Sequence, residues 1–459
     1  MNQKKKTRNE INMTDGPILG RMLLFAFPLM LSGLLQLLFN AADIIVVGKF
    51  AGDTALAAVG SNGPMINLIV NLFIGLSIGG NVLCAKYIGA RREQDVKETV
   101  HTAMTLAFLS GVLLTVIGVL LCVPLLKLMA TPEKVLNLAS VYLRIYFLGM
   151  PAQMVYNFGA SLLRSNGDTK RPLLFLTIAG IVNVALNLYF VIVLHLSVKG
   201  VAIATIVSQY ISATLIVRCM MKETSSIKLE LKKLCLKKDK VVQIFKIGIP
   251  AGLQGIMFSI SNMVIQSSVN GFGEIAIAGN SAATNIEGFV YISLNAFGQA
   301  GMSFTSQNVG AGRNDRLKPI MLRAISSIAV MGAIIGTILT LFGENILGVY
   351  TDTEETIALG MIRVNMVCVP YMIDGFMDGM GAIIRGLGYS FMPMIVTMMG
   401  VCVFRVVWLT TIFKIPKYHT LECIYISYPI SWIITVTIHF ICYFILLKKH
   451  FKVESKEKI

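Results

Sequence analysis

Four acidic side chains lie inside long apolar stretches of the chain, where a charge is costly and usually serves a function. They are Asp43, Glu287, Asp374 and Asp378. Placing an ionisable side chain at the centre of a bilayer costs about 2.5–3.5 kcal/mol, so such residues need a partner, a water-filled cavity or a function. A carboxylate in that setting can bind a proton, Na⁺ or a cationic ligand.

Asp43 ends a polar stripe on one predicted helix. The stripe has spacings of 4, 4 and 3 residues, which place its members on one helix face: Ser32, Gln36, Asn40 and Asp43. Asn183 and Asn187 are four residues apart on another apolar stretch, and we expect them to face Asp43. Two alternatives remain open: Asp43 reaches water near the outer interface, and the asparagines make only interhelical hydrogen bonds.

Glu287 begins a second stripe, which continues with Tyr291 and Asn295 at spacings of four residues. A carboxylate beside an aromatic face in a low-dielectric cavity suits a lipophilic cation. Asp374 and Asp378 lie one turn apart on a third helix face, where two like charges favour the retention of a proton by the pair. The alternative for this pair is a structural ion pair with Arg405 or Arg363.

The composition places these acids in a membrane protein. Of 459 residues, 55% are hydrophobic and 14% charged, and the mean hydropathy is +0.73. Soluble domains carry about 25% charged residues. The eight cysteines form no C-x-x-C pair and the five histidines have no ligand spacing, so we expect no structural metal site. No nucleophile motif and no phosphate-binding G-x-x-x-x-G-K-[ST] motif occurs, which argues against an enzyme and against an ATP-driven pump.

The apolar pattern predicts an all-α membrane protein with twelve spanning helices. The predicted spans are 17–47, 54–82, 98–123, 135–163, 172–194, 200–220, 241–270, 276–306, 319–347, 356–385, 391–413 and 420–447. With the N-terminus in the cytosol, the inner segments hold 29 Lys and Arg and the outer loops six. By the positive-inside rule both termini are cytosolic. The net charge of +16 thus orients the protein and requires no nucleic acid partner.

An internal repeat divides the chain. With an offset of 219 to 222 residues, the following pairs match: Pro28 with Pro250, Gly33 with Gly255, Asn40 with Asn262, the 88–90 segment with 309–311, Arg164 with Arg385, and Pro172 with Pro393. Six spans per half make the repeat parallel, as in alternating-access transporters. The predicted parts are a cytosolic tail (1–16), an N-lobe (17–220), a linker (221–240), a C-lobe (241–447) and a second tail (448–459). Within the linker, residues 222–240 look like a basic amphipathic segment on the inner leaflet, or else a solvated connector.

Three stretches resemble the multidrug and toxic compound extrusion (MATE) family. They are PLMLSGLLQLLFNAADIIVVGKFAG in the first span, QNVGAGR in the second half, and the paired LLRSNG and IIRGLG. The resemblance spans roughly residues 17 to 447. It implies two six-helix bundles around a V-shaped central cavity, and efflux of amphipathic, often cationic compounds driven by Na⁺ or H⁺.

The resemblance also implies roles for particular residues. Asp43 occupies the position of the first-span acid implicated in ion coupling, and Asp374 resembles a cavity aspartate implicated in cation binding. The position of Asn187 is often aspartate in the family, and Glu287 resembles an acid linked to cationic substrates. We therefore predict a coupling-ion set, namely Asp43, Asn183, Asn187, Asp374 and Asp378. The predicted substrate-binding set is Gln36, Asn40, Glu287, Tyr291, Asn295 and Asp374.

The sequence favours a secondary active multidrug exporter that works by antiport and alternating access. The alternative is a flippase of lipid-linked precursors, which is disfavoured because such cavities carry inward-facing Arg or Lys for pyrophosphate. We expect a monomer in the cytoplasmic (inner) membrane, with small-molecule substrates, lipid as its surroundings and no nucleic acid partner. We expect no cofactor other than the coupling ion, H⁺ or Na⁺.

Overall fold

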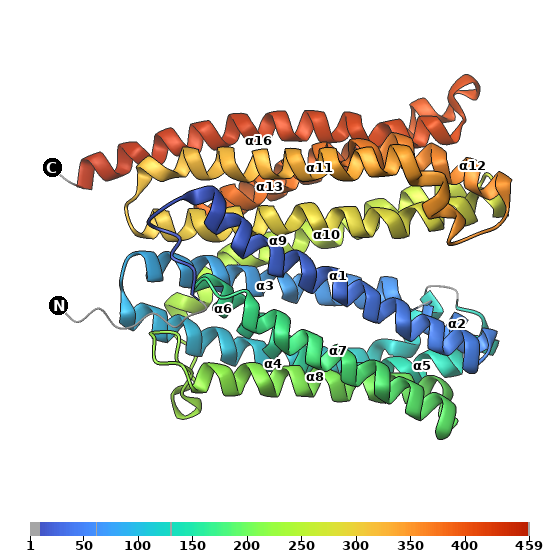
Figure 1. The fold of residues 1–459 in the computed structure, drawn as a ribbon, viewed down its shortest axis with the longest axis horizontal. Helices are drawn as coiled ribbons and strands as arrows, with labels where there is room; N and C mark the ends of the chain where they lie inside the picture. Colours follow the sequence, from blue (N-terminus) through green and yellow to red (C-terminus); the bar gives the residue numbers. More distant parts are fainter. Residues whose placement is uncertain (1–9, 61, 129–130, 458–459) are drawn as a thin grey trace. The chain divides into compact units, whose positions relative to one another are not determined.

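The structure is a computed structural model that describes residues 10–60, 62–128 and 131–457, and these form helices and no strands (Figure 1). The first half contains α1 (Ile18–Phe50), α2 (Asp53–Gly60), α3 (Gly63–Gly89), α4 (Glu93–Leu128), α5 (Glu133–Leu148), α6 (Met150–Ser165), α7 (Lys170–Leu188) and α8 (Ser197–Met221). The second half contains α9 (Lys238–Asn270), α10 (Glu274–Gly310), α11 (Leu317–Gly348), α12 (Glu354–Arg363), α13 (Met372–Gly386), α14 (Phe391–Thr397), α15 (Phe404–Thr410) and α16 (Leu421–Glu457).

The number of helices long and apolar enough to cross a membrane agrees closely with the twelve predicted spans. Ten such helices occur in the described residues, and the bent pair α5–α6 makes eleven. The helix α10, with 37 residues, is also long enough to cross but carries a more polar sequence. The chain is therefore a multi-span membrane protein.

Short irregular turns interrupt or end several of the spans. Three of these turns are π-helical. One continues α7 (Tyr189–Val193), one follows α12 (Val364–Cys368), and one joins α14 to α15 (Met398–Val403). The 3₁₀ turns are Leu231–Lys233, Asn314–Arg316, Val369–Tyr371, Ile412–Lys414 and Pro416–Tyr418. Such irregular turns release backbone groups from the regular ladder and occur often at functional sites.

Proline breaks the fourth and tenth spans at equivalent places. The α5–α6 pair bends by 48° beside Pro151, and the 3₁₀ turn between α12 and α13 contains Pro370. Proline lacks a backbone N–H and its ring clashes with the preceding helical turn, so the helix kinks there. The two prolines are 219 residues apart, within the offset of the predicted repeat.

Backbone conformation supports the repeat independently of residue identity. Three pairs of residues with left-handed φ are each separated by 221 positions: Gly52 (83°) and Gly273 (93°), Arg91 (55°) and Gly312 (65°), Gly167 (90°) and Gly388 (95°). Left-handed φ is rare outside glycine, so a matched series marks equivalent turns. The two halves of the chain therefore share one sequence of helices and turns.

The chain forms two compact units. Among the described residues, unit 1 comprises residues 10–12 and 31–256, and unit 2 comprises residues 13–30 and 257–457. The helices α1 and α9 thus each contribute to both units, and the chain passes from one unit to the other within them. The predicted lobe boundaries at 220 and 241 stay a prediction.

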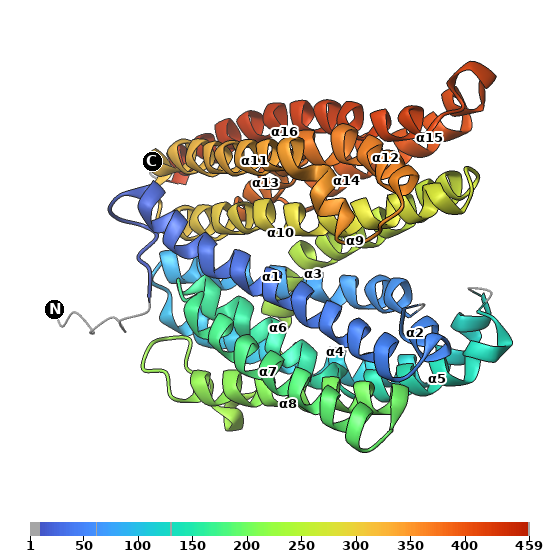
Figure 2. The ribbon, with the colours of Figure 1, turned by 45° about the vertical axis from the view of Figure 1, so that its right-hand side comes forward.

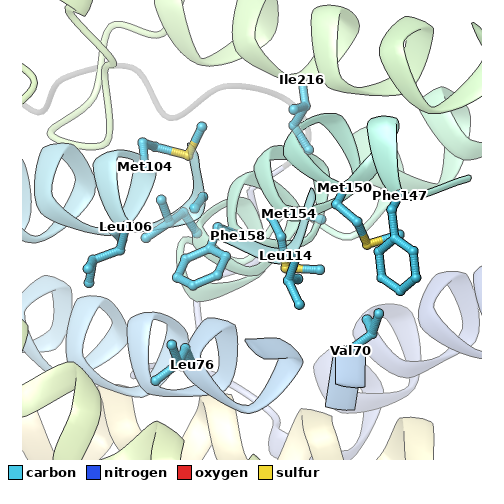
Figure 3. Packing of buried hydrophobic residues seen from close by; sticks show 14 of the residues in the cluster. Val70, Leu76, Met104, Leu106, Leu114, Phe147, Met150, Met154, Phe158 and Ile216 are labelled. Carbon is cyan, nitrogen blue, oxygen red and sulfur yellow. The ribbon is translucent and has the colours of Figure 1, made fainter. Parts of the chain in front are cut away.

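Each unit has its own packed interior. In unit 1, Leu114 on α4 and three side chains of α5 and α6, Phe147, Met154 and Phe158, are fully buried together (Figure 3). In unit 2, α13 packs against α10, α11 and α16, and α10 also packs against α11 (Figure 2). Trp432 and Tyr425 of α16 are buried there, and they line the polar cluster described below.

Glycine allows α3 and the first half of α9 to meet closely within unit 1. A Cβ atom on Gly75 would lie 2.3 Å from the backbone nitrogen of Gly252, and one on Gly248 would lie 2.6 Å from Cα of Leu76. Small residues four apart permit such backbone contact between membrane helices. Gly75 and Gly79 on α3, and Gly248 and Gly252 on α9, form these two small-residue pairs.

Replacing Gly248 with leucine is expected to destabilise the protein by about 1–3 kcal/mol, the usual cost of overpacking. The side chain would displace the backbone of α3, which cannot yield without moving the whole helix. The apparent melting temperature of the detergent-purified protein measures the effect. Gly20→Leu is the matched control, because no atom lies within 4 Å of a Cβ placed there. Equal melting of the two variants would show that the close approach does not matter.

Candidate functional site

The acid of unit 1 is held by the two asparagines predicted to face it. The side-chain amide of Asn187 on α7 donates a hydrogen bond to Asp43 Oδ1 on α1, and also to Asn183 Oδ1 at 3.3 Å. Asn183 and Asn187 are buried, whereas Asp43 is half-buried. Asp43 and Asn187 are 144 positions apart in the sequence, and the fold brings them together. The spacing of polar residues predicted that these three side chains face one another.

The end of α7 positions this group. Asn187 lies one residue before the helix ends at Leu188 and continues as the π-helical turn Tyr189–Val193. Its Oδ1 is buried and has no hydrogen-bond partner among the described residues. Carboxylate and amide oxygens are the ligands that hard cations prefer. Asp43, Asn183 and Asn187 therefore offer a donor set that suits Na⁺, and Asp43 alone can carry a proton.

Polar side chains that the sequence analysis missed extend this site. The hydroxyls of Tyr142 and Tyr146 on α5 lie within electrostatic range of Asp43, and their rings stack with centroids 5.9 Å apart. Tyr146 donates to Gln153 Oε1 at 3.4 Å, and Gln209 on α8 donates to the same oxygen at 3.3 Å. Tyr142 and Tyr146 are four residues apart, so the spacing test applied to the acids could have found them.

The remaining residues of the first stripe differ in their surroundings. Ser32 is buried, whereas Gln36 and Asn40 are exposed on α1. The hydroxyl of Thr205 on α8 donates to the carbonyl of Val201 in its own helix at 2.9 Å. The substrate-binding role of Gln36 and Asn40 stays a prediction.

In unit 2, Glu287 forms an ion pair inside the helix bundle. Arg363 on α12 donates to Glu287 Oε2 on α10 from Nη2 at 2.5 Å and from Nε at 3.1 Å. The hydroxyl of Tyr371 donates to the other carboxylate oxygen at 3.4 Å. The sequence analysis offered Arg363 as a partner for the aspartates, and it is Glu287 that Arg363 contacts. A cationic ligand of Glu287 would therefore compete with Arg363.

Asn280 fixes the guanidinium of Arg363 from the other side. Its Oδ1 accepts hydrogen bonds from Arg363 Nη1 at 2.7 Å and from the Tyr425 hydroxyl at 3.0 Å. Its amide donates to Gln266 Oε1 on α9 at 2.7 Å. Four spans thus contribute to one buried network, which leaves the Arg363 side chain only 6% exposed. The spacing of polar residues along one helix could not predict this network, because its members lie on different helices.

A second arginine lies in the same bundle. Arg405 on α15 is buried, its Nε donates to the Ser431 hydroxyl at 3.0 Å, and its guanidinium lies 3.9 Å from the ring centroid of Tyr428. Cation–π contact of this kind stabilises a desolvated arginine by about 2 kcal/mol. Arg405 Nη2 has no hydrogen-bond partner within the described part of the chain. One side of this guanidinium therefore remains open to an acceptor.

The aspartate pair of α13 interacts with Arg405 and Arg385. Asp374 is buried and interacts electrostatically with Asp378, Arg405 and Glu287. Asp378 is half-buried and interacts with Arg385, about two helical turns further along the same face of α13. The two carboxylates repel each other, so the binding of a proton or a metal cation between them relieves that repulsion. The role of this pair in binding the coupling ion stays a prediction.

The second stripe forms a continuous polar line on α10. Asn295 donates to the Tyr291 hydroxyl at 3.3 Å, and Gln299, which the prediction did not include, donates to Asn295 Oδ1 at 2.7 Å. The Tyr291 hydroxyl lies within electrostatic range of both aspartates of α13. Tyr291 therefore lies within electrostatic range of the acid pair and is bonded to Asn295, whereas Glu287 is engaged with Arg363.

The arrangement fits ion exchange better than covalent chemistry. Within residues 10–60, 62–128 and 131–457, no group of three or more His, Cys, Asp or Glu side chains is placed to hold a metal ion, and all eight cysteines are free thiols. Unit 1 holds a carboxylate beside amide and tyrosine side chains, and unit 2 holds carboxylates among amide, hydroxyl and guanidinium groups. A multi-span protein with an internal repeat and such intramembrane acids belongs to the class of membrane transporters.

The family is shown by sequence comparison. The profile of the MatE family matches residues 28–189 and 250–410, once in each half of the chain. The chain therefore belongs to the MatE family of MATE transporters, and it is a transporter and not an enzyme.

Individual relatives match over most of their length. "Probable multidrug resistance protein YoeA" of Bacillus subtilis is 27% identical over 437 residues, which cover 93% of this chain and 94% of that protein. The "FAD transporter" of Shewanella oneidensis is 26% identical over 355 residues, covering 75% and 77%. A crystal structure of MATE in complex with MaL6 has a TM-score of 0.90 at 22% identity, covering 97% of this chain and all of the other. This structure establishes the fold.

Proposed function

We propose that the chain is a secondary active exporter that expels amphipathic, often cationic compounds in exchange for H⁺ or Na⁺. The observation that carries this proposal is the hydrogen bond from Asn187 to Asp43, with Asn183 bonded to Asn187 in turn, because the group combines an ionisable acid with buried amide oxygens inside spanning helices. An acid in a membrane span is unfavourable to bury, and such residues usually bind ions or substrates.

The name of one relative supports the removal of drugs from the cell. The protein from Bacillus subtilis is named for multidrug resistance, and the one from Shewanella oneidensis for transport of FAD, an anion. The proposal takes cationic compounds as the substrate class because Asp374 and Asp378 lie together beside Tyr291. The flippase alternative finds less support, since Arg363 is engaged by Glu287, and Arg405 lies against the Tyr428 ring within electrostatic range of Asp374.

The proposed cycle is alternating access with ion and substrate in competition. Binding of a cationic compound near Asp374 and Asp378 is opposed by the coupling ion, and release of the compound is favoured when that ion returns. Asp43 takes part as the ion-binding acid of unit 1. The protein works as a monomer in the cytoplasmic membrane with both termini in the cytosol, and it needs no cofactor beyond the coupling ion.

Ethidium efflux from proteoliposomes tests this function. Purified protein is reconstituted, ethidium is loaded, and a Na⁺ gradient or a pH gradient is imposed separately. We expect one gradient alone to drive ethidium movement against its concentration, and dissipation of that gradient with an ionophore to stop it. Movement of FAD but not ethidium would overturn the cationic substrate class. No driven movement of either compound would overturn the proposed antiport.

Asp374→Asn is expected to weaken transport of ethidium about tenfold or more and to affect a neutral amphipathic substrate less. A hydrogen bond or contact to a charged group is worth about 1.5–3 kcal/mol, and 1.4 kcal/mol corresponds to a tenfold change. Initial efflux rates for both substrates measure the effect. Glu287→Gln is the comparison, because loss of the Arg363 pair should impair both substrates through stability. Equal loss for both substrates in Asp374→Asn would remove the charge-specific role.

A further inference from the structure

The segment that joins α8 to α9 has one face packed on unit 1 and one face exposed. Ile227 and Leu229 are buried. Leu231, Leu234 and Leu236 are 50%, 41% and 49% exposed. Three large apolar side chains within six residues are unusual on a surface that faces only water. We call Leu231, Leu234 and Leu236 the leucine face of the linker.

Hydrogen bonds hold the linker in this orientation. The backbone N–H of Glu230 donates to His101 Nε2 at 3.1 Å, and that of Lys237 donates to the Thr102 hydroxyl at 3.3 Å. Both acceptors lie in α4. The backbone N–H of Leu229 donates to the Met220 carbonyl at 3.0 Å. The leucine face is therefore presented by a fixed backbone and cannot turn inward without breaking these bonds.

Lysines surround the leucine face. Six lysines between positions 222 and 238 are exposed: Lys222, Lys228, Lys232, Lys233, Lys237 and Lys238. The acids of the segment are already paired, Glu223 with Arg171, Glu230 with Lys233 at 2.7 Å and Asp239 with Lys240 at 3.1 Å. The surface thus presents apolar side chains within a net positive field.

The position of the linker in the chain determines what lies beside it. It follows directly on α8, which ends at Met221, and precedes α9, which begins at Lys238. Both helices are long and apolar enough to span a membrane, so the linker runs between two points at the membrane surface. A flexible connector of this length would need neither leucines on its outer face nor hydrogen bonds to α4.

We propose that the leucine face inserts into the adjoining leaflet while the surrounding lysines bind anionic lipid headgroups. Apolar side chains buried at the headgroup and acyl boundary, flanked by Lys, are the usual composition of an interfacial anchor. Each Lys near an anionic surface contributes about 1 kcal/mol. The linker is then a recognition surface for anionic lipid, which fixes α8 and α9 at the membrane surface. This role does not depend on the transported substrate.

Depth measurement with a spin label at Cys235 tests the proposal. Cys235 lies between Leu234 and Leu236 and is partly exposed. Cys219→Ser removes the other accessible thiol, and the remaining six cysteines are buried. The full-length protein is reconstituted in vesicles of phosphatidylcholine with 30 mol% phosphatidylglycerol, or of phosphatidylcholine alone. Collision of the label with O₂ and with a water-soluble nickel complex is then compared.

In the anionic vesicles we expect the label to be protected from the nickel complex and accessible to O₂, and in neutral vesicles we expect that protection to fall about tenfold. High salt should reduce it in the anionic vesicles as well. A label that meets the nickel complex equally in both vesicles would overturn the proposal. Equal protection in both would overturn the recognition of anionic lipid.

Two variants separate the contributions of charge and apolar surface. The charge variant K232Q/K233Q/K237Q/K238Q should lose protection in anionic vesicles. Its matched control K414Q/K417Q/K448Q/K449Q removes four exposed lysines elsewhere and should keep protection. The variant L231S/L234S/L236S should lose O₂ access while its lysines remain. All changed side chains are exposed, and elution of each variant as one sharp peak verifies folding. Loss of protection in the control as well would contradict a role specific to the linker.

Discussion

Replacing Asp43 with asparagine is expected to reduce gradient-driven efflux by about tenfold or more while the protein remains folded. Asparagine keeps the shape and can still bond to Asn187, but it cannot carry a negative charge or exchange a proton. A contact to a charged group is worth about 1.5–3 kcal/mol, and 1.4 kcal/mol corresponds to a factor of ten. The initial rate of ethidium efflux at several pH values measures the effect.

Glu344→Gln is the matched control for Asp43→Asn. Glu344 is an exposed acid of α11, so its replacement removes one carboxylate from unit 2 without touching either acid group described above. Efflux in the control should equal that of the original protein. If Asp43→Asn also transported normally across the pH range, Asp43 would have no part in ion coupling, and the coupling would have to involve Asp374 and Asp378 alone.

Replacing Arg363 with glutamine is expected to destabilise the protein by roughly 3–5 kcal/mol, the usual cost of removing one partner from a buried ion pair. Glu287 would keep a hydrogen bond from Tyr371 but lose the guanidinium that neutralises it. Asn280 would lose one of its two donors. The apparent melting temperature in a fixed detergent is the measurement.

The double variant E287Q/R363Q distinguishes a broken ion pair from a simple loss of packing. Two neutral amides can bond to each other, so the double variant should recover most of the stability that R363Q loses. Arg323→Gln on the exposed face of α11 is the control for loss of an arginine. If the double variant melted no higher than R363Q, the ion pair would not be the source of the stability.

Much of the helical architecture could be predicted because membrane spans follow from apolar length alone. The predicted spans correspond to the helices observed, and the repeat reappears in the backbone as three pairs of left-handed residues 221 positions apart. The interruptions were harder to predict. Proline marks the breaks at Pro151 and Pro370, but nothing local marks the π-helical turn after Asn187, which depends on tertiary packing.

In the candidate site, contacts within one helix could be predicted and contacts between helices could not. Residues on one helix face, such as Asn183 with Asn187 or Tyr291 with Asn295, could be grouped by spacing, since side chains four residues apart are neighbours. Pairing across helices could not. The sequence contained three acids and two arginines for unit 2, and only the fold matches Glu287 with Arg363 and sets Arg405 against Tyr428. Three tyrosines were not singled out as neighbours of the charged groups, although Tyr371 donates to Glu287, Tyr142 lies within electrostatic range of Asp43, and Tyr428 lies against Arg405.

The central claim is that a cationic compound and a coupling ion compete for the carboxylates of this protein. Calorimetric titration of ethidium into the purified protein tests it most directly, in two buffers of different ionisation enthalpy and with Na⁺ present or absent. We predict either that binding releases protons, so that the measured heat depends on the buffer, or that Na⁺ weakens binding. Binding that releases no proton and does not respond to Na⁺ would contradict the account.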